Sequence, residues 1–223
     1  MKWIYRLERK LGYNFGVPNL MMYVTGTMLA VYMLTLLIMP GLMGMMVFHR
    51  GLFLDGEIWR VVTFLLLPPR PHEGPLWVVI TLFVTYRIGT ALEQAWGTTR
   101  FTLYLLLGFV GAVAAGFITG FGVNTYIYFS LILAFCYMYS NATFLLFFIL
   151  PVKAKYIAIF IWALFGLAFI QGNFASRVAI IFSLINFFLF FGPDVWNTAT
   201  QNYKAAKRRH EYRKNWGENN PWR

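Results

Sequence analysis

An arginine stands in the middle of an apolar stretch of this sequence. Arg87 lies about twelve residues into the run from Pro75 to Leu92, which is long and apolar enough to lie in lipid. A charged side chain there costs about 2.5–3.5 kcal/mol on insertion scales, so a partner or a function is expected. Side chains on a helix tilt toward its N-terminus, which predicts that Arg87 points toward mid-membrane. Asn186, at similar depth in the last apolar run, is the leading candidate to bond it inside the protein. The alternative is that Arg87 contacts lipid or another protein.

Two further charges flank the turn that follows this run. Glu93 closes the run, Gly97 provides a turn, and Arg100 begins the next apolar segment. The turn predicts a Glu93–Arg100 ion pair at the membrane surface, worth about 0–1 kcal/mol. Such a pair orients a helical hairpin and performs no chemistry.

Hydrolytic chemistry lacks its usual parts. A serine becomes a nucleophile only when a base takes its proton. The three histidines all lie outside the apolar runs: His49, His72 and His210. Ser130 lies within a run, but the amines of Lys153 and Lys155 are predicted at the membrane surface, too far to activate it. One cysteine, Cys136, and three scattered histidines form no metal-ligand spacing, so no catalytic residue, metal ion or cofactor is predicted.

The elements that position these residues are predicted to be membrane-spanning helices. Of the 223 residues, 59% are hydrophobic and only 12% are charged, which favours lipid as the solvent. Since about 20 apolar residues cross the hydrocarbon core, the sequence predicts an all-α membrane protein with six transmembrane helices. The predicted spans are residues 20–40, 75–92, 101–120, 123–139, 156–171 and 175–191. Two shorter apolar pieces, 58–67 and 143–150, are predicted to be interfacial or re-entrant.

The distribution of Lys and Arg predicts the orientation of these spans. With the N-terminus inside, fourteen basic residues fall on the inner side and four on the outer side, and Arg87 lies within a span. This asymmetry favours a multi-pass protein of the cell membrane with both termini in the cytoplasm. Residues 1–19 are then an amphipathic cytoplasmic segment, 20–192 form the membrane domain, and 193–223 form a basic cytoplasmic tail.

Several short motifs resemble the rhomboid superfamily when they are taken in order. Trp59-Arg60 resembles the Trp-Arg pair of that family's first external loop. Leu92-Glu93, followed by Gly97 and Arg100-Phe101, resembles the signature that closes its second helix. Tyr86-Arg87 is similar to derlins, the non-proteolytic relatives. The resemblance covers roughly residues 15–192 and implies a rhomboid-like bundle of six transmembrane helices, with these residues as structural or client contacts.

The resemblance also implies where protease residues would stand, and this sequence departs from the family there. Rhomboid proteases carry a serine in Gly-x-Ser-Gly at the start of the fourth helix, whereas this chain reads Gly122-Val123-Asn124-Thr125. The sixth helix of the proteases carries a histidine near its start, whereas here Ser176 stands in the opening residues. An amide cannot replace the hydroxyl nucleophile. The catalytic positions at Asn124 and Ser176 are therefore expected to be lost, and the protein is not expected to be an enzyme.

The function that this resemblance implies is that of a pseudoprotease, which binds or handles transmembrane segments of client proteins without cleaving them. The predicted fifth and sixth spans, about 16 and 17 residues long, would also thin the bilayer locally. The alternatives are a small-molecule carrier or channel, with Arg87 lining a polar pathway, and an atypical rhomboid-family serine protease. A carrier predicts paired broken helices or further intramembrane charge, and neither is evident.

The basic tail predicts partners of its own. The cluster Lys207-Arg208-Arg209-His210 suits anionic lipid at the membrane surface, where each basic residue is worth about 1 kcal/mol. Tyr212, Trp216 and Trp222 could stack on RNA bases, but no specific nucleic-acid partner is predicted. The simplest alternative is a solvated anchor that follows the positive-inside rule.

Overall fold

The computed structural model describes residues 15–69, 71, 74–140, 143–146 and 150–218. The chain divides into two compact units, Met1–Phe187 and Phe188–Arg223. The helices are α2 (Leu20–Leu37), α3 (Leu42–Met46), α4 (Arg50–Leu54), α5 (Arg60–Thr63), the short 3-10 helix η1 (Phe64–Leu66), α6 (Pro75–Trp96), α7 (Thr98–Thr119), α8 (Thr125–Met138), α9 (Ala154–Gln171) and α10 (Phe174–Glu218). Strands β1 (Thr143–Leu146) and β2 (Leu150–Lys153) form an antiparallel pair.

Five helices in the described part of the chain are long and apolar enough to cross a membrane: α2, α6, α7, α9 and the Phe174–Pro193 part of α10. The chain is therefore a mainly helical, membrane-embedded protein. α8 is apolar but has 14 residues, or about 21 Å of helix, against a hydrocarbon core of about 30 Å. Of the six predicted spans, the fourth is therefore the short one.

These bounds change two sequence predictions and show the secondary structure of a third segment. The fifth and sixth spans are 18 and 20 residues long, longer than the 16 and 17 residues from which local membrane thinning was predicted. Residues 143–146 and 150, which belong to a piece predicted to be interfacial or re-entrant, lie in the antiparallel strands β1 and β2, with Thr143 opposite Lys153. Helix α10 continues past residue 192 to Glu218, so the polar segment that follows the last span is largely helical.

The ends of the helices follow their local sequence. Pro75 occupies the first turn of α6, where its missing N–H is not needed. Gly97 has φ 84° and connects α6 directly to α7, and Gly120 ends α7 in the left-handed region with φ 87°. Residues with a side chain rarely adopt these angles, so glycine produces two sharp turns here.

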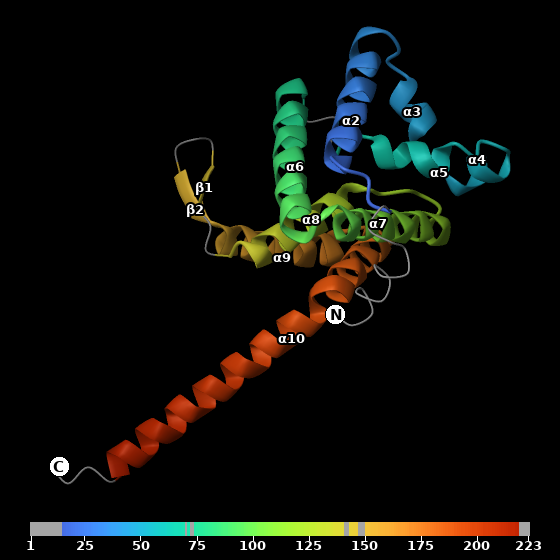
Figure 1. The fold of residues 1–223 in the computed structure, drawn as a ribbon. Helices are drawn as coiled ribbons and strands as arrows, with labels where there is room; N and C mark the ends of the chain where they lie inside the picture. The colour runs from blue at the N-terminus through green and yellow to red at the C-terminus, as the bar shows by residue number, and fades with distance from the viewer. Residues whose placement is uncertain (1–14, 70, 72–73, 141–142, 147–149, 219–223) are drawn as a thin grey trace. The chain divides into compact units, whose positions relative to one another are not determined.

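Within the first unit, α2 packs against α6, and α6 also contacts α7 and α8 (Figure 1). Gly89 lets α2 approach α6, because a Cβ atom there would lie 2.1 Å from Cγ of Met21. Small residues on α7 do the same for other neighbours. A Cβ at Gly108 would lie 3.1 Å from the Asn186 amide nitrogen, and one at Gly116 would lie 2.9 Å from the Phe48 ring. Close backbone approach of this kind is a main source of helix packing in lipid.

The segment between α2 and α6 is anchored by an aromatic cluster. The buried rings of Phe48 and Phe64 lie 5.7 Å apart between centroids, and Phe117 of α7 lies 5.1 Å from Phe48. Backbone bonds join Phe48 and Arg50 to the turn that follows α7, including Gly122 N to Phe48 O at 3.1 Å. This segment is therefore a packed part of the first unit.

Candidate functional site

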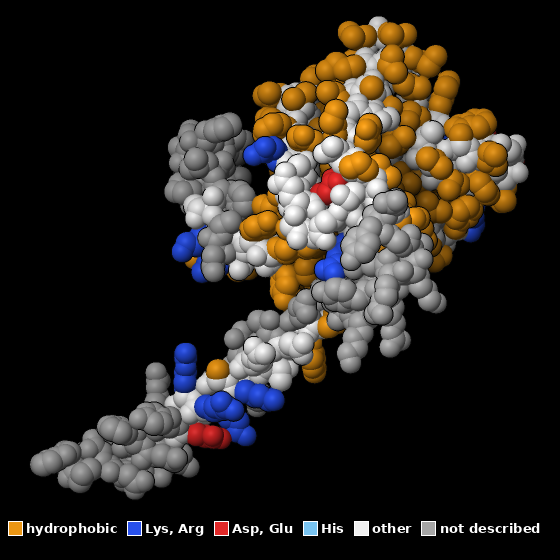
Figure 2. Space-filling view, viewed as in Figure 1, with side chains coloured by type: hydrophobic (Ala, Val, Ile, Leu, Met, Phe, Trp, Pro, Cys, Tyr) orange, Lys and Arg blue, Asp and Glu red, His pale blue; other side chains and the backbone are white. Residues whose placement is uncertain are grey.

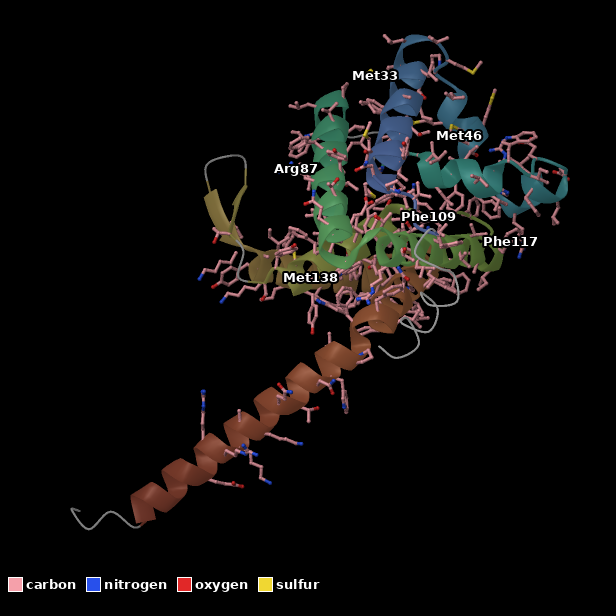
Figure 3. All side chains as sticks on the ribbon, viewed as in Figure 1. Met33, Met46, Arg87, Phe109, Phe117 and Met138 are labelled. Atoms are coloured by element: carbon pink, nitrogen blue, oxygen red, sulfur yellow. The ribbon has the colours of Figure 1, made fainter. Side chains whose placement is uncertain are left out.

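Arg87 lies on the outer face of α6. Residues two apart on a helix point about 200° apart, and both neighbours at that spacing, Thr85 and Gly89, are buried. The Arg87 side chain is exposed, on the side of α6 away from α2 (Figure 3). It forms no hydrogen bond or ion pair with any residue that the structure describes.

The predicted bond between Arg87 and Asn186 is therefore wrong. The Asn186 side chain is buried against α7, where its Nδ2 donates to the carbonyl oxygen of Tyr104 at 3.2 Å. Its Oδ1 has no partner among the described residues. The two residues were predicted at a similar depth in their spans, but their side chains lie on different surfaces. Asn186 points into the bundle and Arg87 points out of it.

The α6 face around Arg87 is apolar toward the start of the helix and polar near its end. Leu76, Phe83 and the polar Gln94 share this face by helical spacing, and all three are exposed. Gln94 lies near the end of α6, whereas Arg87 lies about 18 Å from its start and about 13 Å from its end. In Figure 2 hydrophobic side chains cover most of the visible surface of α2–α6. In a membrane, a cation at this position with no partner among the described residues can bind an anion that arrives through the lipid.

Asn124, which stands where the nucleophile was expected to be lost, has a structural role. Asn124 is buried at the start of α8, and its Nδ2 donates to the carbonyl oxygens of Phe64 at 3.0 Å and Leu67 at 2.8 Å. The hydroxyl of Tyr128, one turn later, donates to Leu65 O at 3.0 Å. Phe64 O also accepts from the backbone N–H of Leu67 at 3.3 Å, so the side chains of Asn124 and Tyr128 supply further donors to the carbonyl groups where η1 ends.

The serines near this position are also occupied. Ser130 is fully buried, donates to Ile127 O at 2.8 Å, and lies 3.1 Å from the hydroxyl of Tyr104. At the start of α10, the backbone N–H of Ser176 donates to Asn173 Oδ1 at 2.9 Å, which caps the helix. Neither serine has a base beside it among the described residues, as a nucleophile would need.

The two residues of the Trp-Arg pair differ in burial. The side chain of Trp59 is 53% exposed, whereas that of Arg60 is buried. Arg60 forms a salt bridge through Nε with Glu57, and its Nη1 donates to the carbonyl oxygens of Gly44 at 2.9 Å and Val47 at 2.8 Å. Arg60 therefore joins α5 to the end of α3.

The α6–α7 turn contains a buried carboxylate with an unexpected partner. Glu93 Oε1 accepts a hydrogen bond from the backbone N–H of Asn19 at 2.8 Å, just before α2 begins. An anion there also suits the positive end of the α2 dipole. This bond ties the start of α2 to the end of α6, and the predicted ion pair of Glu93 with Arg100 stays a prediction. Tyr86 and Arg100 are half-buried, and Gly97 forms the turn between the two helices.

The described residues include few groups suited to histidine or metal chemistry. His49 is exposed, and its Nδ1 accepts a bond from the N–H of Gly51 at 3.3 Å. His72 lies outside the described residues, and the His210 side chain is likewise not described. No group of three or more His, Cys, Asp or Glu side chains that could hold a metal ion occurs in the described part of the chain.

No family model and no curated protein matches the chain. The function proposed for the chain therefore rests on the residues and contacts described above.

Sequence reasoning missed the tyrosines and Asn19. Tyr104 and Tyr128 lie in apolar runs, and nothing in the local sequence shows that their hydroxyls reach chain segments 26 and 63 residues away. A buried tyrosine hydroxyl usually has a partner, which is the one general signal that could have drawn attention to them.

Proposed function

We propose that this chain is a rhomboid-like pseudoprotease, with α8 as the sixth helix of its membrane bundle. It binds transmembrane segments of client proteins at the outer face of α6 and does not cleave them. The derlin-like Tyr86-Arg87 pair, the Trp59-Arg60 pair and the basic residues of the inner side support this proposal, with both termini in the cytoplasm.

The exposed position of Arg87 is the observation that carries the proposal. A guanidinium in lipid and a carboxylate in a client helix each carry an insertion cost of about 2.5–3.5 kcal/mol when alone. Contact between them relieves both costs at once, because each charge replaces lipid with an opposite charge. Arg87 therefore favours clients with an acidic residue near the middle of the span.

The alternatives fit these contacts less well. A carrier or channel needs Arg87 on a pathway inside the bundle, whereas its side chain projects from the outer face of α6. An atypical serine protease needs an accessible, activated hydroxyl, whereas Ser130 is buried and bonded to Ile127 and Tyr104.

A photo-crosslinking experiment in proteoliposomes tests the proposal. The crosslinker replaces Phe83, which is 59% exposed one turn from Arg87. The probe is a leucine-rich transmembrane peptide with one central aspartate. We expect an adduct that contains the intact peptide, at least about tenfold more abundant than with an all-leucine peptide, since the pair relieves more than 1.4 kcal/mol.

The matched control places the crosslinker at Phe160 of α9, which is 62% exposed and distant in sequence from Arg87. Equal adducts at Phe83 and Phe160 would show non-specific contact through the lipid. Peptide fragments that are lost in Ser130→Ala would show that the chain is a protease after all.

A further inference from the structure

The second unit carries a concentration of exposed positive charge. Side chains of Lys204, Lys207, Arg208 and Arg209 are all exposed on α10, and Lys and Arg gather along this part of the helix in Figure 2. Glu211 offsets little of that charge, because its carboxylate lies 4.0 Å from the Lys207 ammonium and both side chains are more than half exposed. The helix therefore presents a net positive surface.

Three of these cations lie on the same side of the helix. Lys204, Lys207 and Arg208 are spaced i, i+3 and i+4, so they lie on one side of α10. A row of cations along one side of a straight rod matches an extended negative surface better than it matches a single small anion.

A proline stands at the end of the membrane-spanning part of α10. The apolar segment Phe174–Pro193 ends where Gly192 and Pro193 occur together within the helix. Proline donates no backbone hydrogen bond to the preceding turn and crowds its carbonyl, which makes it the commonest site of a helix bend. Trp196, 75% exposed, follows three residues later, and tryptophan is enriched at membrane–water interfaces.

The length of the helix makes the bend decisive for lipid binding. A helix that rose straight from the membrane would place Lys204 about 16 Å and Arg209 about 24 Å beyond Pro193. Electrostatic attraction decays over about 8 Å at physiological ionic strength, so these residues would be beyond the field of the lipid surface. A helix that turns at Pro193 brings all four cations within that field.

We propose that α10 bends at Gly192-Pro193 and that its basic part lies on the anionic phospholipid headgroups of the membrane face from which it emerges. The partner is the negatively charged lipid surface, to which the segment is already tethered by its continuity with the span. This docking does not require client binding.

The test measures how close residue 205 lies to the lipid surface in the full-length protein. Ala205 is exposed and Cys136 is buried, so a spin label reacts selectively with an Ala205→Cys variant. The protein is reconstituted in phosphatidylcholine vesicles with or without phosphatidylglycerol, and the label's accessibility to a water-soluble nickel chelate is measured by electron paramagnetic resonance. We expect accessibility to fall in the phosphatidylglycerol vesicles and to recover at high salt.

Neutral substitutions identify the residues responsible. Each of Lys204→Gln, Lys207→Gln, Arg208→Gln and Arg209→Gln is expected to weaken docking about fivefold. The matched control exchanges lysine for arginine and arginine for lysine at the same four positions, which preserves the charge and should preserve docking. Pro193→Ala should weaken docking by favouring a straight helix.

Three results would overturn the proposal. Equal accessibility in both kinds of vesicle would exclude lipid docking, and unchanged docking in Pro193→Ala would exclude the hinge. Protection of the label only when RNA is added would show that the basic surface binds nucleic acid instead.

Discussion

Arg60→Met is expected to lower the free energy of unfolding by about 3 kcal/mol. The substitution leaves the Glu57 carboxylate without its partner and removes the donor that binds Gly44 O and Val47 O. Breaking a buried ion pair from one side costs about 3–5 kcal/mol, and the lower end applies because Glu57 is 32% exposed. Unfolding in mixed detergent micelles, monitored by circular dichroism, measures this loss.

Two variants separate this role from charge alone. Arg60→Lys keeps the positive charge but lacks the planar group that binds a carboxylate and carbonyl oxygens together, so we expect an intermediate loss. Arg50→Met is the matched control, because Arg50 is exposed and makes one side-chain bond, to Phe117 O at 3.2 Å. It should cost less than about 1 kcal/mol. An equal loss in Arg50→Met would contradict the special role of Arg60.

Arg87→Leu is expected to leave the protein as stable as before, or more stable. The substitution removes an exposed charge from α6 that has no partner among the described residues, and the relief is up to about 2.5–3.5 kcal/mol in a bilayer. Client capture should fall to the level of the all-leucine peptide. Stabilisation together with loss of activity is typical of a functional residue, whereas a structural clamp would lose stability.

A double-mutant cycle with Asn186→Leu tests the corrected geometry. Since Asn186 bonds Tyr104 and Arg87 faces outward, the two substitutions should be additive to within about 0.5 kcal/mol. A coupling energy well above 1 kcal/mol would restore the pair that the sequence suggested.

The sequence predicted where the spans lie along the chain better than it predicted which face of each span is buried. Five of the six predicted spans coincide with helices of spanning length, because runs of about 20 apolar residues are a direct signal of the bilayer. Which face of a span is buried depends on its neighbours. The expected Arg87–Asn186 pair failed for this reason, since depth along the chain says nothing about direction. Gly89 carried a usable signal, because a small residue two positions from Arg87 marked the opposite face as the packed one.

Prediction of the candidate site from the sequence has a similar limit. Asn124 could be recognised as an unsuitable nucleophile from its side chain alone. Its bonds to Phe64 and Leu67, 60 and 57 residues away, could not be predicted, because they depend on how η1 packs against α8. The hairpin of β1 and β2 was missed because short apolar pieces have no periodicity that separates strand from helix.

A charge exchange between Arg87 and the client tests the central claim most directly. Arg87→Glu should abolish capture of the aspartate peptide at the Phe83 crosslinker, because two like charges then meet in lipid. The same variant should capture a peptide with arginine in place of aspartate, which the original protein rejects. Recovery only in the exchanged pair is the result we predict. Capture that does not depend on the sign of either charge would contradict the assignment of Arg87 as the client-binding residue.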